Sequence, residues 1–474
     1  MKNCPYCKQP VEENYPYCPS CNKPLISNLE NSRIRSFNSD LIEDISFSYD
    51  LTEEDGIYDA TIIEDDKIEQ EIQDINDILE RKEILGDPIP GSLLLKRSSL
   101  YYKKRDLPNA LKNLELALKN FEEEDDLFNV AICHNEIGLI QEDIGFFDQA
   151  IYHFNRSLEI LKEVKDDQKY IKVLNNLGNI YYSVKDLEHS YKYYQNALDL
   201  SKQKNLIFEE IKTSSNLVEV LYLLKDHDRI KRILTRNMEF FKQKEDAYGM
   251  ITTKIKYGKL YYFLSDNYDL ANEELNAALQ LLERISNNLS IYMRAKLEWE
   301  CYLYLGKINL LWNNLEFTEV CFIKSLEAVR IFSIGENINE GEILENLADL
   351  YNSKGEIEKA IEYYNLSCEI FYKFGDNEKC AQIKVIISEK YLNFEEDASR
   401  ATKFLKEALI IYEDLHYIKE SADIHNKLGD IYKNNKMQDI ALEHYKSARS
   451  SYSEIHDEEN LKLIEEKIKS LKDI

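Results

Sequence analysis

The sequence predicts an all-α fold in which about nine helical hairpins stack into an α-α superhelical solenoid. Two observations carry this prediction. A block of about forty residues recurs from near residue 92 to the C-terminus, and each block has small and aromatic residues at helical spacing. One hairpin cannot bury its own apolar face, so consecutive copies must stack and share a continuous core.

A small residue marks the first helix of each copy, and Gly178 is the clearest example. Successive markers are separated by 40, 40, 40, 40, 48, 42, 40 and 41 residues. An aromatic residue often follows three places later and a second small residue twelve or thirteen places later, as at Tyr181 and Ser190. Small residues at these places let paired helices approach closely, so each copy predicts two antiparallel helices. The markers are Ser98, Gly138, Gly178, Val218, Gly258, Gly306, Ala348, Ser388 and Gly429.

One copy is irregular because eight extra residues precede Gly306. Eight residues equal about two helical turns. We therefore expect the superhelix to change pitch around residues 280–300.

The pattern resembles the tetratricopeptide repeat. Leu177-Gly178, Tyr181, Ser190, Tyr194 and Ala197 match its order of Leu-Gly, aromatic, small, aromatic and small residues. The period is forty rather than the usual thirty-four, and the proline that normally closes the second helix is missing. This longer form is similar to the arrays of kinesin light chains and of bacterial peptide-sensing regulators. The resemblance covers residues 91–456 and implies a concave groove that binds extended peptides or partner helices.

Residues 1–27 contain two Cys-Pro-x-Cys motifs, which predict a small zinc ribbon. The candidate ligands are Cys4, Cys7, Cys18 and Cys21. Four thiolates in two such pairs can close a tetrahedron around Zn²⁺ and leave no open position, so the metal is predicted to be structural. Its binding contributes on the order of 10–16 kcal/mol in comparable peptides. A rubredoxin-like iron centre and a pair of disulfides are the alternatives.

Residues 28–90 form an acidic connector in which the forty-residue pattern is absent. Residues 40–90 carry eighteen Asp or Glu against three Lys or Arg, a composition typical of disorder. Ile68, Ile72, Ile75 and Leu79 nevertheless predict an amphipathic helix over 66–85. The connector is either a solvated linker or an intramolecular latch that docks on the array. Its counter-surface would include Lys172, Lys212, Lys256 and Lys259.

The resemblance places the peptide-binding groove on the first helix of each copy. The positions three before, one after and four after each marker are the ones expected to face it. Amides there can bond both the N–H and the C=O of a bound backbone, and aromatic rings offer apolar contact. Carboxylates replace amides in the last three copies, which predicts a preference for basic segments at that end. The predicted groove residues are Asn135, Asn175, Asn179, Tyr182, Ser215, Glu219, Tyr222, Lys259 and Tyr262.

Residues 457–474 predict a capping helix, because Leu461, Ile464 and Ile468 fall on one stripe and would cover the last hairpin. Five further cysteines lie singly in predicted helices, where we expect buried free thiols. They are Cys133, Cys301, Cys321, Cys368 and Cys380.

Composition excludes several functional classes. No run approaches the roughly twenty apolar residues of a membrane helix, and the N-terminus is no signal peptide, so we expect a soluble, cytoplasmic protein. The net charge of −27 argues against nucleic-acid binding. No phosphate-binding loop, HExxH or GxSxG motif is present, and the eight histidines are scattered over separate repeats, so we expect no enzymatic activity.

Two functions remain. In the first, the chain is an interaction scaffold or adaptor that binds a peptide or partner segment in its groove, with the zinc ribbon as a second docking module. In the second, it is a peptide-responsive signalling regulator with the connector as latch. The sequence leaves the partner and the oligomeric state open.

Overall fold

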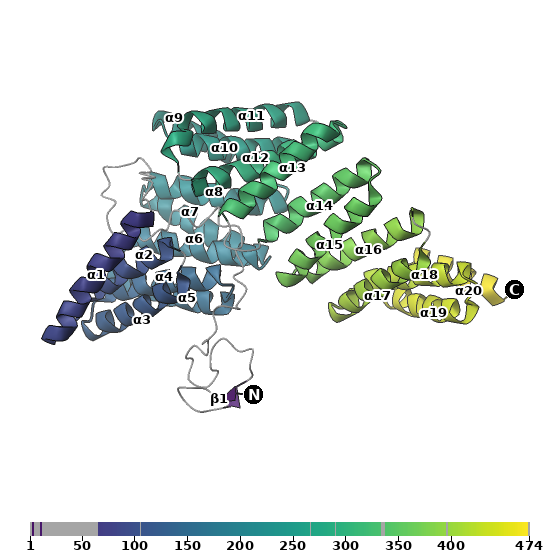
Figure 1. Ribbon diagram of the computed structural model, residues 1–474, viewed down its shortest axis with the longest axis horizontal. Coiled ribbons are helices and arrows are strands. Elements are labelled where there is room, and N and C mark those ends of the chain that lie inside the picture. The colour runs from purple at the N-terminus through teal and green to yellow at the C-terminus, as the bar shows by residue number, and fades with distance from the viewer. Residues whose placement is uncertain are drawn as a thin grey trace. The chain divides into compact units, whose positions relative to one another are not determined.

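The computed structural model describes residues 2–3, 10–11 and 65–472, apart from 105, 266, 290, 333–336 and 395–396. Within this part of the chain, twenty α-helices follow one another in a repeated, solenoid-like arrangement (Figure 1). Nine consecutive pairs, from α2 with α3 to α18 with α19, correspond to the nine copies of the repeat. The all-α prediction is confirmed for these residues, except for two short strands near the N-terminus. Strands β1 (Lys2–Asn3) and β2 (Pro10–Val11) pair antiparallel, with Lys2 opposite Val11.

The helices belong to two compact units that meet in sequence between Val220 and Leu221. The first unit contains α1 (Asp65–Leu85), α2 (Gly91–Lys103), α3 (Leu107–Glu123), α4 (Leu127–Asp143), α5 (Phe147–Val164), α6 (Asp167–Ser183), α7 (Leu187–Gln203) and most of α8 (Ile207–Leu223). The second unit contains α9 (His227–Gln243), α10 (Ala247–Phe263), α11 (Tyr268–Ile285), α12 (Ile291–Leu311), α13 (Leu315–Phe332), α14 (Ile338–Ser353), α15 (Ile357–Lys373), α16 (Asn377–Asn393), α17 (Ala398–Asp414), α18 (Ile418–Asn434), α19 (Gln438–Glu454) and α20 (Glu458–Lys472).

Many of the described helices begin with the same two local features. An aspartate before the first turn accepts a hydrogen bond from the backbone N–H three residues later, as Asp186 does from His189 at 3.1 Å. This interaction satisfies one of the N–H groups that a helix leaves unpaired at its start. The preceding turn contains one residue with positive φ, such as Lys185 at 63°. Lysine and glutamate occupy several of these left-handed positions, which more often hold Gly, Asn or Asp.

In four of the nine hairpins, an aromatic ring lies against the marker glycine. A Cβ added to Gly178 would lie 2.6 Å from Cε1 of Tyr194, sixteen residues later. Gly138, Gly306 and Gly429 face Phe154, Phe322 and Tyr445 in the same way. The Tyr194 hydroxyl also donates to Oδ1 of Asn179 at 2.5 Å, and Tyr445 donates to Asp430 at 2.7 Å. Glycine is therefore required for close packing, while the hydroxyl fixes the register of the two helices.

A helix caps each end of the array. The stripe of Ile68, Ile72, Ile75 and Leu79 predicted over 66–85 is buried in α1, which packs against α2 (Figure 1). Two polar contacts add to this packing, from Arg97 Nη1 to Asn76 Oδ1 at 2.8 Å and from Lys104 Nζ to Glu69 Oε2 at 2.5 Å. These two contacts are to the first hairpin, whereas the predicted counter-surface was the mid-array lysines.

At the other end of the array, α20 buries Ile464 and Ile468 against α19. Leu461, the third residue of the predicted stripe, is partly buried against the same cluster. The last hairpin therefore does not end on an open apolar face.

The eight extra residues of the irregular copy are taken up locally. A short 3₁₀ turn (Ser286–Asn288) follows α11, and α12 has 21 residues where most helices have 17. The insertion therefore lengthens α12 and the segment that leads into it.

Two of the five single cysteines do not match the expectation of free thiols. Cys368 in α15 and Cys380 in α16 form a disulfide. Cys133, Cys301 and Cys321 are buried and outside any disulfide, as expected. Burial raises the pKa of all three thiols, to about 12 for Cys321, so these three are not reactive nucleophiles.

The histidines are also less scattered than expected, because four of them form two pairs. His134 and His153 bring their Nδ1 atoms within 2.8 Å, and His425 and His444 within 2.9 Å. Both pairs have the same register, four residues before and fifteen after a marker glycine. A contact between two ring nitrogens needs one donor and one acceptor, so a neutral pair satisfies it. Burial lowers the pKa of His134, His153 and His444 to about 4 and also lowers that of His425.

The glycine–ring contact can be tested with Gly178→Ala. The added Cβ would overlap the Tyr194 ring, and overpacking of this kind typically costs about 1–3 kcal/mol. We expect urea unfolding to show a loss of that size. Gly341→Ala is the comparison, because the nearest side-chain atom to its Cβ is 3.1 Å away, and we expect a smaller loss. Equal losses for the two variants would contradict the proposed role of the ring.

The histidine pairs predict a loss of stability in acid. Histidine in the unfolded chain titrates near about pH 6.5, whereas the folded values are depressed to about 4. As the pH falls through this window, the unfolded chain binds protons first and folding is disfavoured. We expect His134→Gln/His153→Gln to lose less unfolding free energy than the wild type between these two pH values. An acid profile that is unchanged in the double variant would contradict this account.

Candidate functional site

The three predicted groove asparagines are buried on the first helices of two successive copies in the first unit. Asn135 in α4 and Asn175 and Asn179 in α6 have exposed fractions of 7%, 1% and 3%. Each is bonded within the chain. Asn135 Nδ2 donates to Glu136 Oε1 at 3.0 Å, and Asn179 accepts the Tyr194 hydroxyl. Their role toward a peptide stays a prediction.

Helices α4, α6 and α8 of the first unit are joined to one another by side-chain amides. Asn176 Nδ2 in α6 donates to Asn135 Oδ1 in α4 at 2.9 Å. Asn175 Nδ2 donates to Thr213 Oγ1 in α8 at 2.9 Å. A polar row therefore crosses α4, α6 and α8, and we call this side of the first unit the even-helix face. The row consists of Asn135, Glu136, Asn175, Asn176, Glu209 and Thr213.

Four members of this row, Glu136, Asn176, Glu209 and Thr213, were not predicted from the sequence. Glu136 and Asn176 lie two places before their markers, and Asn216 has the same position in α8. A polar residue that recurs two places before the marker was the sequence signal that could have identified this position. Glu209, one helical turn before Thr213, is held by Gln168 Nε2 at 3.2 Å and lies 4.0 Å from Lys172 Nζ.

The row carries carboxylates in an environment that disfavours their charge. Burial raises the pKa of Glu136 to about 8, against the opposing effects of the Asn135 hydrogen bond and of Lys169 and Lys172. Glu142 lies outside the row, further along α4; burial raises its pKa well above its usual range, and Asp143 adds to the shift. At neutral pH, Glu136 therefore retains its proton to a large extent.

The remaining first-unit candidates are half-buried. Tyr182 follows Gly178 by four places in α6. Ser215 in α8 donates to the Ile211 carbonyl at 3.0 Å, and Glu219 lies one turn further along the same helix. These three side chains extend the even-helix face beyond the polar row.

In the second unit, the structure brings together Tyr222, Lys259 and Tyr262. Lys259 Nζ lies 5.0 Å from the centre of the Tyr222 ring and 3.0 Å from Glu300 Oε1. The Tyr262 ring packs edge-on against Tyr304 with centres 5.2 Å apart. The Tyr222 hydroxyl donates to the Lys256 carbonyl. These rings form an aromatic cluster around Lys259, which is paired with Glu300.

The carboxylates of the last copies are matched by cations or hydroxyl groups of the chain itself. Glu345 pairs with Lys379 at 2.8 Å, Glu389 with Lys427 at 2.6 Å and Asp430 with Lys467 at 2.7 Å. Asp349 accepts the Tyr364 hydroxyl, and Asp423 accepts that of Tyr452 at 2.6 Å. These contacts weaken the case for a basic ligand at that end.

The predicted zinc ligands, Cys4, Cys7, Cys18 and Cys21, lie outside the described residues. In the sequence, Cys4 follows β1 directly and Cys7 precedes β2 by three positions. Among the described residues, no three His, Cys, Asp or Glu side chains are grouped so that they could hold a metal ion.

Helices of the described ranges are also too short or too polar to cross a membrane.

Family models match three stretches of the array. Two models of the tetratricopeptide repeat match residues 91–163 and 171–204. A model of the soluble NSF attachment protein, SNAP, matches residues 324–472. No curated protein sequence matches this chain.

Several solved structures are similar to the chain at low identity. BtubC (BKLC) from P. vanneervenii is 19% identical, with a TM-score of 0.32, over 42% of this chain and 78% of that one. A signal-transduction ATPase with numerous domains and a tetratricopeptide repeat sensor, from Pyrococcus horikoshii, is 14% identical, with a TM-score of 0.48, over 71% and 53%. The apo quorum sensor NprR from B. thuringiensis is 15% identical, with a TM-score of 0.47, over 73% and 97%. The family matches and the helix pairs of the described residues show that the chain carries tetratricopeptide-type repeats.

Proposed function

We propose that this chain is a non-enzymatic protein–protein interaction scaffold, or adaptor, whose even-helix face binds an extended peptide segment of a partner. The observation that carries the proposal is the polar row, in which Asn176 and Asn175 join α6 to the helices on either side. A peptide backbone presents N–H and C=O groups along its length, and a line of amides matches both. The match to tetratricopeptide repeat models supports this function.

Tyr182 and Ser215 supply the accessible part of this face. Their half-buried side chains lie at successive copies of the repeat, beside the buried row. A tyrosine offers apolar area together with a hydroxyl, a combination that is common at binding surfaces. A bound segment would contact these side chains before it reaches the amides beneath.

The two Cys-Pro-x-Cys motifs suit a second docking module held together by Zn²⁺. Cys4, Cys7, Cys18 and Cys21 form a donor set of four thiolates, which fits tetrahedral zinc. The ladder between β1 and β2 encloses the first motif in the sequence. Bound zinc would fold this segment without taking part in a reaction.

The alternative function is a peptide-responsive regulator in which the acidic connector acts as a latch. The observation that favours it is the docking of α1, the last part of the connector, on α2 through its apolar stripe. A connector fixed at this point is tethered to the array, so even weak contacts with it become effective.

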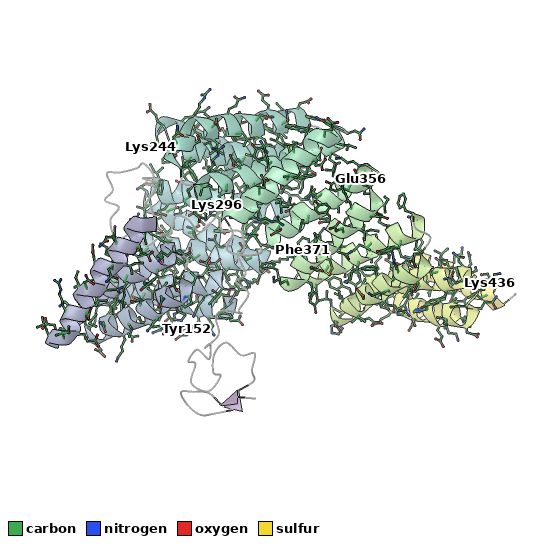
Figure 2. All side chains as sticks on the ribbon, in the orientation of Figure 1. Tyr152, Lys244, Lys296, Glu356, Phe371 and Lys436 are labelled. Atoms are coloured by element: carbon green, nitrogen blue, oxygen red, sulfur yellow. A yellow bond between two sulfur atoms is a disulfide. The ribbon has the colours of Figure 1, made fainter. Side chains whose placement is uncertain are left out.

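Tyr182→Ala tests the binding face. Phage-displayed random dodecapeptides selected on the full chain would serve as ligands, with affinity read by fluorescence anisotropy. We expect Tyr182→Ala to weaken binding roughly tenfold, as for a central aromatic contact. The matched control is Tyr152→Ala, because Tyr152 lies on α5 with 54% of its surface exposed (Figure 2). Equal affinities for the two variants would contradict the assignment of the face.

The zinc prediction is tested by metal analysis of the purified full chain. We expect one equivalent of Zn²⁺ per chain, and we expect Cys4→Ser/Cys7→Ser to lose it while the thermal unfolding of the helical array is unchanged. Cys133→Ser is the control, since this buried thiol is remote in sequence from the two motifs. A wild-type protein without zinc would exclude the ribbon.

A further inference from the structure

We propose that the outer side of α13 is a dimerisation surface, on which a second copy of this chain docks with its own α13 antiparallel to the first. The proposal concerns one helix of the second unit and does not depend on the even-helix face. Two observations carry it. An apolar stripe is exposed on α13 and is missing from the second helix of every other copy, and the charges beside this stripe are complementary to those of an identical helix turned end for end.

Helix α13 is apolar on two opposite sides. One side packs into the array and buries Phe322 and Val329, among others. On the other side, Phe317, Val320 and Ile323 are 44%, 48% and 41% exposed. These three residues are spaced by three, so they lie along one side of the helix, and we call them the outer stripe. A surface helix normally has one apolar and one polar side. The outer stripe therefore indicates that a second surface covers α13.

The second helices of the other copies are polar at the places where α13 carries the outer stripe. The stripe positions lie one residue before, two after and five after Thr318, the second small residue of this copy. In each of the other eight copies, at most one of the three corresponding residues is apolar. In α7, for example, they are His189, Lys192 and Gln195. Single apolar residues on a surface are normal, whereas a contiguous group marks an interaction site. The repeat by itself therefore does not explain the stripe.

The charged residues beside the stripe identify its occupant. Glu316 and Lys324 lie four residues before and four residues after Val320. A two-fold axis at Val320 would relate two antiparallel copies of α13, and residues equally far from Val320 in opposite directions would then lie at the same level. Glu316 of one chain would meet Lys324 of the other, and Phe317 would lie level with Ile323. The stripe would thus pack against itself between two identical ion pairs.

Both charged side chains are available for this contact. Glu316 is exposed and forms no hydrogen bond or ion pair with another residue in the described part of the chain. Lys324 Nζ lies 4.9 Å from the centre of the Tyr302 ring and 3.4 Å from its hydroxyl oxygen. The ring attracts the ammonium group and keeps it beside the stripe. An ammonium group has three N–H donors, so Lys324 retains donors for a carboxylate.

Other occupants fit these features less well. An amphipathic helix that binds a membrane surface is rich in cations beside its apolar side, whereas α13 has three glutamates against one lysine and one arginine. A segment of an unrelated protein could cover the stripe, but it would not require Glu316 and Lys324 to be placed symmetrically about Val320. An interface of one helix from each chain is small, and small interfaces are typical of weak, concentration-dependent association.

Sedimentation equilibrium of the full chain over a concentration series tests the dimer. We expect the average mass of the wild type to rise with concentration from one chain towards two. Val320→Asp places two carboxylates together on the two-fold axis, so we expect it to weaken association about tenfold or more. The matched control is Ile410→Asp on α17, because Ile410 is 59% exposed on another second helix, and we expect it to associate as the wild type does. Thermal unfolding checks that both variants are folded.

Charge reversal tests the arrangement of the two helices. Glu316→Lys and Lys324→Glu should each weaken association about tenfold, because like charges then meet twice in one interface. The double variant Glu316→Lys/Lys324→Glu restores both ion pairs, and we expect its association to return to that of the wild type. An equimolar mixture of the two single variants should also form a dimer, since each chain then supplies the charge that the other lacks.

Three results would overturn the proposal. The first is a wild type that keeps the mass of one chain up to its highest soluble concentration. The second is an equal loss of association in Val320→Asp and Ile410→Asp, which would place the contact elsewhere. The third is a double charge reversal, or a mixture of the single variants, that fails to restore the dimer, because the antiparallel pairing of Glu316 with Lys324 requires both to do so.

Discussion

The close contact between a marker glycine and an aromatic ring is the packing constraint on which four of the nine hairpins depend. At Gly178 no side chain fits, because the Tyr194 ring occupies the place of a Cβ. The same contact recurs at Gly138, Gly306 and Gly429. It brings two helices to a short separation and leaves the ring fully buried. The hydroxyl then bonds the residue after the glycine, so packing and register are set by one side chain.

This contact also determines which residues of the helix can contact other helices. Because the ring takes one side of α4 and of α6, residues two and three places before the marker meet the neighbouring even-numbered helices instead. In the first unit these residues are amides and a carboxylate, and they bond from helix to helix. Burial of Glu136 in this row destabilises the folded state, and the same burial raises the pKa of its carboxyl. A stabilising design would place apolar side chains at such positions, so the polar row is the strongest sign of a binding role.

Much of the fold could be predicted because it follows from local periodicity. The marker interval predicted nine hairpins, and the spacing of Ile68, Ile72, Ile75 and Leu79 predicted the stripe that α1 buries. Contacts between helices were harder to predict from the sequence. The disulfide of Cys368 and Cys380 joins two helices, and the pairing of His134 with His153 does the same. A periodic pattern gives the face on which each residue lies but not the residue it meets on the next helix.

The sequence by itself therefore determined the repeat, its helical hairpins and the columns of polar residues, because each follows from spacing along one helix. Only the tertiary structure decided which of those polar side chains are buried, and what they bond. Asn135 and Asn175 were predicted to face a ligand, and the structure shows them committed to neighbours within the chain. Burial and pairing depend on helices brought together by packing, and sequence spacing does not carry that information.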